Sequence, residues 1–419
     1  RMAIIYVLFA FFVLLTLYDF KKGVLLFMPF KLFFGMNVRL LPSMTVDFAF
    51  CLFAISLFGL RRHLFVKEKF PLKKCFVIYS VFYVLNCLYP DMALNYIPRI
   101  VISVLCFSYV YYCCLQNRKD IYFAVYSYLF FIVLLCGNGL LGPLLGINPL
   151  DDYIQSISNE ELSFFSDNDL VRFGRERYRS FIPHAISYGV LCVTLLYLLV
   201  WYLLKVAHSG KAWIIMGTCL LLSGVVICTS RTPILGLFPF VIIFRDMKVS
   251  FRKIRPFLLI LVCFLLLQGD YILYLLESVF TSNVADDAGG SSTEMRMVQF
   301  SIALRFFLQS PLFGQGMEFN PTLFYNEFYG GESVWLPLLA NQGMVGLTGY
   351  LFYNVCLYKM AQSSSGKNVL YALLLSWLIM RSATSLIGVT DATFLSVFFI
   401  IYKWYNIEQH ATDNYCSRL

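Results

Sequence analysis

Four arginines lie within eight residues of one another in the string RFGRERYRSFIPH, which spans residues 172–184: Arg172, Arg175, Arg177 and Arg179. Arginine forms paired hydrogen bonds with phosphate and carboxylate oxygens, and the string contains no lysine. The pattern indicates either an anion-binding site or a solvated strip beside lipid headgroups. His184 ends the string directly before an apolar run, where a structural role and a role as proton acceptor both stay open.

A second group of candidate residues lies between residues 291 and 347. Four apolar residues share one helical face here, which predicts a helix that packs on the rest of the protein: Met295, Val298, Ile302 and Phe306. Arg296 lies near the start of this helix, and the string PLFGQG at residues 311–316 predicts a turn after it. Glu332 precedes the next apolar run, where a carboxylate either caps a helix or serves as a base.

The sequence offers no pattern for a metal or cofactor. None of the 13 cysteines forms a CxxC pair or a cluster with histidine, and most lie inside apolar runs as small apolar residues. Asp286 and Asp287 fall in the glycine- and serine-rich string DDAGGSS, which is a poor rigid ligand site. We expect neither a metal ion nor an organic cofactor.

The elements that must position these residues are those of a membrane protein. Hydrophobic residues make up 59% of the 419 residues and charged residues 14%, against about 45–50% and about 25% in soluble domains. The formal net charge of +9 does not indicate nucleic acid, because most Lys and Arg residues sit in short gaps between apolar runs. The first run follows only Arg1 and lacks a cleavage-site pattern, so we expect no cleavable signal peptide.

A membrane-spanning helix needs about 20 mainly apolar residues. Apolar segments occur at 2–18, 24–42, 44–60, 73–89, 97–115, 121–142, 184–204, 212–228, 232–244, 256–276, 333–358, 368–387 and 390–405. Their apolar residues do not alternate with period two, which favours helices over a barrel. The predicted fold is therefore all-α: one polytopic transmembrane bundle over residues 1–419, with 12 or 13 spans. The alternatives differ in whether 24–42 crosses the membrane or is re-entrant, since Lys31, Asn37 and Arg39 interrupt it.

Basic residues predict the orientation of the bundle. They cluster in alternate connections: Arg61, Arg62, Lys67, Lys69, Lys73 and Lys74; Arg118 and Lys119; Lys205 and Lys211; Arg245, Lys248, Arg252, Lys253 and Arg255; Lys359 and Lys367; and Lys403. The positive-inside rule places these connections in the cytoplasm. The long connections 143–183 and 277–332 then lie outside, and the second precedes the last three spans.

Arg231 lies in the string TSRTP at residues 229–233, between two short apolar segments. This gap is too short for an ordinary loop, so Arg231 should lie near the outer membrane face. An arginine at bilayer depth costs about 2.5–3.5 kcal/mol on insertion scales, which favours a functional role over snorkelling to headgroups.

These strings, in this order, resemble the O-antigen polymerase and O-antigen ligase superfamily. Ser230-Arg231-Thr232 is similar to its S-R pattern, and residues 296–316 are similar to R-x-x-x-W-x-x-A-L-x-x-F-x-x-x-P-L-x-G-x-G, with Phe300 at the Trp position. Residues 332–346 are similar to H-N-x-x-L-x-x-L-x-x-x-G-x-x-G, and residues 177–184 to the basic string before a span. Glu332 replaces the ligase histidine, which favours a polymerase.

The resemblance implies a glycosyltransferase that polymerises undecaprenyl-diphosphate-linked repeat units of O-antigen or capsule at the periplasmic face of a bacterial inner membrane. It implies a metal-independent, inverting reaction. Arg231 and Arg296 would bind the donor diphosphate, and four arginines are further candidates: Arg175, Arg177, Arg179 and Arg381. Glu332 would be the base, with His184 as its rival. The expected partners are lipid-linked oligosaccharide, membrane lipid and a chain-length regulator protein, and not nucleic acid.

Three other functions stay open at this point. A ligase would join finished glycan to lipid A–core. A transporter or flippase often shows paired halves or interrupted helices at the membrane midplane, and the sequence shows neither. The last alternative is a membrane partner without catalytic activity.

Overall fold

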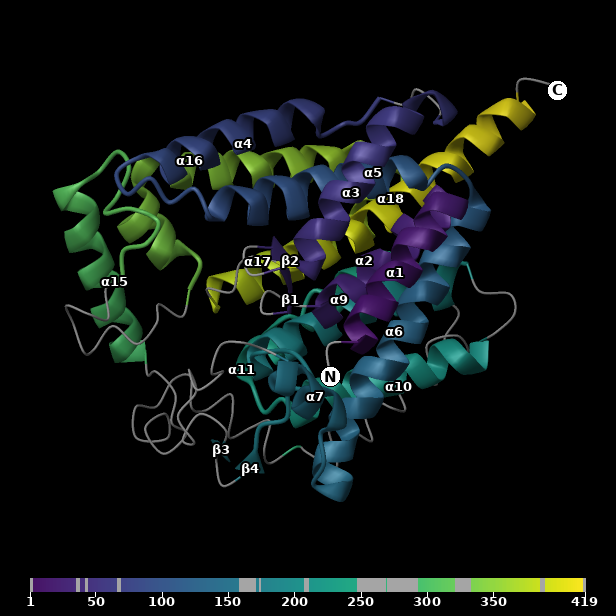
Figure 1. Ribbon diagram of the computed structural model, residues 1–419, viewed down its shortest axis with the longest axis horizontal. Helices are drawn as coiled ribbons and strands as arrows, with labels where there is room; N and C mark the ends of the chain where they lie inside the picture. The colour runs from purple at the N-terminus through teal and green to yellow at the C-terminus, as the bar shows by residue number, and fades with distance from the viewer. Residues whose placement is uncertain are drawn as a thin grey trace.

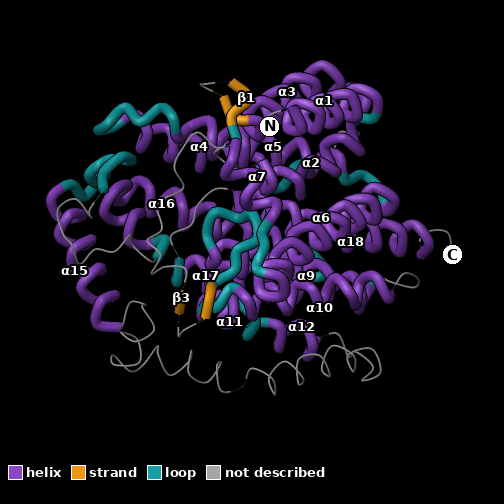
Figure 2. The backbone as a smooth tube through the Cα atoms, turned by 60° about the horizontal axis from the view of Figure 1, so that its bottom comes forward, coloured by secondary structure: helices purple, strands orange, loops and turns teal. Residues whose placement is uncertain are grey.

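The structure, a computed structural model, describes residues 3–34, 38–41, 44–65, 69–157, 171–172, 175–206, 211–246, 269, 293–320, 333–384 and 389–416. Helices account for nearly all of these residues (Figure 2). Two short antiparallel ribbons complete the described part: β1 (Arg39–Leu41) with β2 (Met44–Thr45), and β3 (Val171–Arg172) with β4 (Arg175–Glu176). The predicted all-α class is confirmed.

The helices mostly follow the apolar segments of the sequence. The first half of the chain forms α1 (Ala3–Tyr18), α2 (Phe20–Phe34), α3 (Val46–Arg61), the short 3-10 helix η1 (Arg62–Leu64), α4 (Lys73–Leu88), the π-helix η2 (Pro98–Cys106), α5 (Phe107–Cys114), α6 (Arg118–Leu145) and α7 (Pro149–Ile157). The second half forms α9 (Ala185–Lys205), α10 (Lys211–Ile227), α11 (Arg231–Leu235), α12 (Phe240–Asp246), α15 (Thr293–Gln309), α16 (Trp335–Gln362), α17 (Lys367–Ser382) and α18 (Val389–Cys416). Apart from residue 269, the predicted segment 256–276 lies outside the described residues, as does the DDAGGSS string.

The predicted segment 232–244 is helical and apolar but not continuous, because the chain forms α11, a turn and then α12. Gly236 and Pro239 lie in that turn, and proline has no backbone N–H for a continuing helix. The carbonyl of Gly236 is freed by the break and accepts hydrogen bonds from the hydroxyls of Tyr197 (3.2 Å) and Ser376 (2.6 Å). The break therefore leaves no unsatisfied carbonyl at Gly236.

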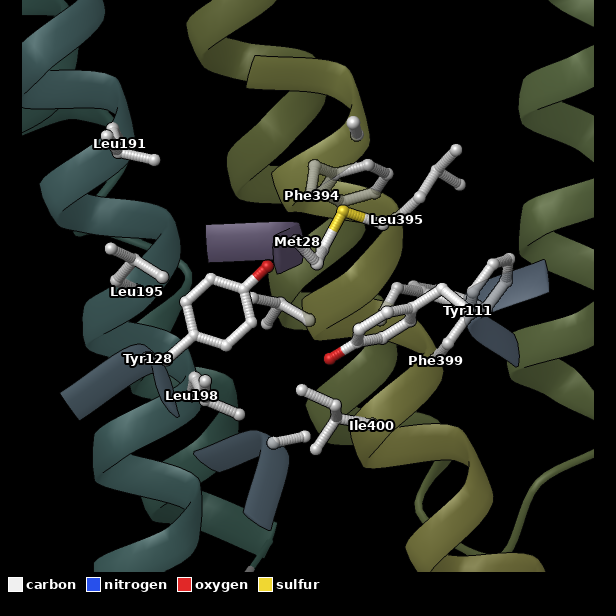
Figure 3. Packing of buried hydrophobic residues seen from close by; sticks show 14 of the residues in the cluster. Met28, Tyr111, Tyr128, Leu191, Leu195, Leu198, Phe394, Leu395, Phe399 and Ile400 are labelled. Atoms are coloured by element: carbon white, nitrogen blue, oxygen red, sulfur yellow. The ribbon is translucent and has the colours of Figure 1, made fainter. Parts of the chain in front are cut away.

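A large apolar core fills the bundle around α9 and α18. Almost every residue of α9 is buried. Figure 3 shows leucines of α9 (Leu191, Leu195 and Leu198) and residues of α18 (Phe394, Leu395, Phe399 and Ile400) in this core. Among the described helices, α6 and α9 are long and apolar enough to cross a bilayer, and four shorter helical stretches are also apolar: Ala3–Tyr18, Pro98–Cys114, Ala212–Ile227 and Arg231–Ile243.

The basic connections gather at one end of the bundle, here called the basic end. Lys21 donates to Gln116 (2.7 Å) and lies 3.7 Å from Asp120, so the corner between α1 and α2 meets the start of α6. Three further contacts bring basic residues there: Arg61 Nη2 to Leu17 O (3.1 Å), Arg118 over the Trp404 ring (5.2 Å) and Lys403 over the Tyr112 ring (4.1 Å). The described residues Arg61, Arg118 and Lys403, expected on one side of a membrane, thus lie at one end.

Lys31 of α2 and Asp47 of α3 form a buried ion pair. Lys31 Nζ lies 2.6 Å from Oδ1 and 2.8 Å from Oδ2 of Asp47, and Lys31 is 1% exposed. The Phe107 ring lies 5.6 Å from the same ammonium group. Most residues of α2 are buried, and α2 packs between α1 and α6. An interfacial helix would expose one face to water, so this burial favours α2 as a full member of the bundle. It is shorter than the predicted segment 24–42.

Candidate functional site

Helix α16 is broken at Gly343, whose backbone lies at φ 58° and ψ −153°. The predicted continuous segment 333–358 is therefore two helical parts that meet at an angle. Residues 311–316, predicted as a turn, do form a turn and dock into the break. Four backbone hydrogen bonds join them: Gln315 N–H to Ala340 O (2.8 Å), Gly316 N–H to Asn341 O (3.0 Å), Met344 N–H to Pro311 O (2.9 Å) and Val345 N–H to Leu312 O (3.0 Å). The turn thus replaces the hydrogen bonds that the broken helix lacks.

Helix α15 leads into this turn and packs on the first part of α16. Its buried face consists of Gln299, Ile302, Ala303 and Phe306. Ile302 and Phe306 were predicted to face the protein, whereas Val298 is 41% exposed and does not. The buried face is rotated because Ile302, Ala303 and Phe306 share a cluster with Leu336 and Ala340 of α16.

The turn is also attached to the connection after α4. The Asp91 carboxylate lies against Gly316 and accepts a hydrogen bond from the Glu318 N–H at 3.3 Å. The rings of Tyr89 and Phe313 meet edge to face at 5.0 Å. The end of α4, the turn and the break in α16 therefore form one packed unit at the end of the bundle opposite the basic end. In Figure 1 α4 and α16 run side by side toward α15.

A cavity of about 220 Å³ lies beside the break. Its walls come from α4, η2, both parts of α16, the end of α17 and the start of α18. Five tyrosines line it: Tyr79, Tyr83, Tyr96, Tyr350 and Tyr353. Asn341 and Gln342, directly before the break, add two side-chain amides. The charged lining residues are Arg99, Arg381 and Asp391. The cavity is thus rich in hydrogen-bonding groups and carries more positive than negative side chains.

Arg381 is the most unusual of these residues, since its side chain is only 2% exposed. Its Nη2 lies 3.9 Å from Asp391 Oδ2, and its guanidinium carbon lies 5.4 Å from the centre of the Trp377 ring. Among the described residues, Nε and Nη1 have no hydrogen-bond partner. A buried guanidinium with unused donors is costly unless a ligand or water receives its hydrogen bonds. Arg381 therefore indicates a ligand site.

Among the residues that the structure describes, Arg381 is the one predicted site residue that lines this cavity. Glu332 lies outside the described residues. Val334, two positions later, does line the cavity, and its N–H donates to the Arg381 carbonyl at 3.0 Å. The start of α16 is thus attached to the end of α17 close to Arg381.

Arg179 has a structural role in the connection between α7 and α9. Its Nη2 lies 3.0 Å from Asp151 Oδ2, and its Nη1 donates to the Pro183 carbonyl at 2.7 Å. Next to it, Ser180 donates to the Leu135 carbonyl at 2.8 Å and accepts from Asn138 at 3.0 Å. These contacts tie the arginine string to α6 and α7.

The other arginines of the string lie nearby on the same connection. Arg175 belongs to the short strand β4, and Arg177 follows it with a half-buried side chain. Tyr178 donates to Glu176 Oε2 at 2.7 Å, and this hydrogen bond, with burial, raises the pKa of Tyr178. Neither Arg177 nor Arg179 is among the described residues that line the cavity, and the side chain of Arg175 lies outside the described part of the structure.

His184 caps the start of α9. Its Nδ1 accepts a hydrogen bond from the Ile186 N–H at 3.0 Å. A neutral imidazole that accepts at Nδ1 carries its proton on Nε2. Service as a base would therefore require His184 to give up the cap.

Arg231 and Arg296 lie on different helices. Arg231 is the first residue of α11, is half-buried, and belongs to a helix that contacts α9 and α17. Arg296 is exposed on α15, which contacts α16. Both helices pack on helices that line the cavity, although neither arginine lines it.

Sequence reasoning missed Arg99, Asp391 and the tyrosines. The available signals were Arg99 near the start of the apolar segment 97–115 and Asp391 near the start of the apolar segment 390–405, where an ionisable residue suggests function. The tyrosines gave no signal, because aromatic residues in an apolar run usually belong to the core.

The sequence matches no protein-family model, and a search of curated proteins finds no significant match.

Proposed function

We propose that the protein is a polytopic membrane glycosyltransferase that polymerises undecaprenyl-diphosphate-linked repeat units at the outer face of a bacterial inner membrane. The observation that carries the proposal is Arg381, a buried guanidinium with unused donors in a cavity rich in tyrosine hydroxyls. Such a cavity suits an oxygen-rich ligand. The order of the motifs in the sequence supports the same family of reactions.

The membrane setting rests on composition and on the charge distribution. The chain is 59% hydrophobic, and basic residues of several described connections gather at one end of the bundle. By the positive-inside rule the basic end faces the cytoplasm. The cavity lies at the opposite end, which the lipid-linked substrate reaches from the outer leaflet.

The proposed reaction is a single displacement at the anomeric carbon of the growing chain. A hydroxyl of the incoming unit forms a bond to that carbon, and the bond from the carbon to the diphosphate oxygen breaks. Undecaprenyl diphosphate leaves with the electron pair, and the hydroxyl proton passes to a base, for which Glu332 is the candidate. One displacement inverts the configuration. Arg231 and Arg296 are the candidates that stabilise the leaving diphosphate, since arginine binds phosphate through paired hydrogen bonds.

The test is a deletion strain complemented with single variants, read by glycan profiling and by protein level. Arg231→Ala, Arg296→Ala and Arg381→Ala should each leave single-repeat decoration, and lysine at Arg231 or Arg296 should restore polymer only in part. Arg62→Ala, at the exposed basic end, is the matched control and should give wild-type polymer. Unglycosylated core with accumulated lipid-linked polymer would instead identify a ligase. Wild-type glycan in the deletion strain would exclude both functions.

A further inference from the structure

We propose that the cavity is the acceptor subsite, and that it holds a single sugar ring, the non-reducing terminal ring of the incoming repeat unit. This inference rests on the proposed function and adds to it which substrate enters the cavity and by which end. It follows from the size of the cavity, its closed inner end and the chemistry of its walls.

The size of the cavity limits it to part of an oligosaccharide. Its volume of about 220 Å³ is below the range of about 300–1,000 Å³ that is usual for pockets that enclose drug-sized ligands. One sugar ring fits such a space, whereas a complete repeat unit of several rings does not. The remaining rings must therefore lie outside the cavity.

We infer from the lining residues that the cavity is open at one end and closed at the other. Arg99 is exposed, and it lies at the start of η2, where the chain enters the bundle from the connection after α4. Tyr79 and Tyr353 stack at 5.0 Å farther into the bundle and belong to the inner wall. One helical turn beyond them, Phe76 and Leu357 are buried in the main apolar core. The ligand must therefore enter from the end of the bundle opposite the basic end.

A closed inner end distinguishes between the growing chain and the incoming repeat unit as the ligand of the cavity. The reacting ring of the growing chain carries diphosphate on one side and glycan on the other, so it cannot enter a closed cavity. The terminal ring of the incoming unit is attached on one side only. It can enter while the rest of its glycan extends outward to its own lipid anchor.

The walls match the two kinds of surface on a sugar ring. Tyrosine rings offer apolar surface to the C–H groups of a pyranose, and tyrosine hydroxyls hydrogen-bond its oxygens. Arg381 Nε and Nη1 offer two donors for sugar oxygens. Asp391, 3.9 Å from the guanidinium, holds one side of it and acts as a positioning residue.

The experiment uses the purified full-length protein in lipid nanodiscs and measures thermal stabilisation by two probes. One probe is the lipid-linked repeat unit, and the other is undecaprenyl diphosphate, which has no sugar. Leu338→Trp fills the cavity from α16, and Leu351→Trp, on an exposed face of the same helix, is the matched control. Leu338→Trp should lose the additional stabilisation given by the sugar, keep the stabilisation by undecaprenyl diphosphate and lose polymer formation. Leu351→Trp should resemble the wild type.

A smaller substitution covers the case in which Leu338→Trp does not fold. Tyr353→Phe removes one hydroxyl from the wall, and Tyr358→Phe, exposed on α16, is its control. Tyr353→Phe should weaken binding of the repeat unit about 10-fold, as expected for one lost hydrogen bond, and leave undecaprenyl diphosphate unaffected. Equal losses with both probes would place the diphosphate in the cavity and overturn the inference. Wild-type binding and wild-type polymer in both Leu338→Trp and Tyr353→Phe would also overturn it. Failure of the wild type to polymerise lipid-linked units would overturn the proposed function instead.

Discussion

Gly314 and Gly343 meet backbone to backbone, and the space between them excludes a side chain on either residue. A Cβ atom on Gly343 would lie 2.6 Å from the Gly314 nitrogen, and one on Gly314 would lie 2.4 Å from the Asn341 carbonyl carbon. Both glycines have positive φ, 71° at Gly314 and 58° at Gly343. Through this contact the turn at residues 311–316 and the break in α16 fit together.

Alanine at Gly343 should therefore destabilise the protein and abolish polymer, because it brings both a collision and an unfavourable backbone conformation. Gly314→Ala should act in the same direction. Gly137 of α6 is the control, since nothing lies within 4 Å of a Cβ there. Gly137→Ala should raise stability by about 0.5–1 kcal/mol. Thermal unfolding in nanodiscs measures both effects, and a Gly343→Ala protein as stable as the wild type would contradict the role of the joint.

Arg381 and Asp391 should behave as a coupled pair. Asp391→Asn removes the charge that holds the guanidinium, so polymer formation should fall while the protein level is maintained. In the Arg381→Ala background the same change should have little further effect, because residues that act through each other are not additive. A double-mutant cycle on the rate of polymer formation measures the coupling. Fully additive losses would show that Asp391 acts independently of Arg381.

Substitutions that preserve the helix cap made by His184 can distinguish the two candidate bases, Glu332 and His184. His184→Ala removes a helix cap and should cost about 0.5–2 kcal/mol of stability, whereas His184→Asn keeps a capping side chain. His184→Asn should polymerise normally if the histidine is structural. Glu332→Gln should be inactive at a normal protein level if Glu332 is the base. The opposite pattern, with His184→Asn inactive and Glu332→Gln active, would give the role to His184.

Polymer formation should survive treatment with EDTA. Arginines can neutralise a diphosphate without a divalent cation, and the sequence offers no metal-binding motif. The measurement is the rate of polymer formation in nanodiscs with and without the chelator. Loss of activity that Mg²⁺ or Mn²⁺ restores would show that a metal takes part.

The Lys31–Asp47 ion pair should respond differently to single and double substitution. Lys31→Met leaves an uncompensated carboxylate and should cost about 3–5 kcal/mol. Replacing both residues, as Lys31→Met with Asp47→Leu, should restore most of this stability. Thermal unfolding of the three proteins tests the prediction. A double variant as unstable as Lys31→Met would mean that the pair contributes more than mutual neutralisation.

Helix positions could be predicted because long apolar runs and basic connections carry strong signals. The break in α16 could not, because a glycine inside an apolar run also fits a continuous helix. Gly343 breaks the helix only because residues 311–316 supply partners for the freed backbone groups. The same limit applies to Tyr79 and Tyr353, whose place in the cavity depends on packing between α4 and α16. Arg381 could be proposed from its predicted side of the membrane, whereas its burial beside Asp391 could not be predicted from the sequence.

The walls of the cavity come from two parts of the chain that are synthesised at different times. Tyr79 through Leu105 belong to the early part, and Met317 through Asp391 to the late part. At a synthesis rate of about 5–20 residues per second, about 15–60 s separate the emergence of Leu105 from that of Asp391. During that interval the early wall has no partner. The cavity is therefore complete only after α18 has been synthesised, and every shorter nascent chain lacks part of its late wall.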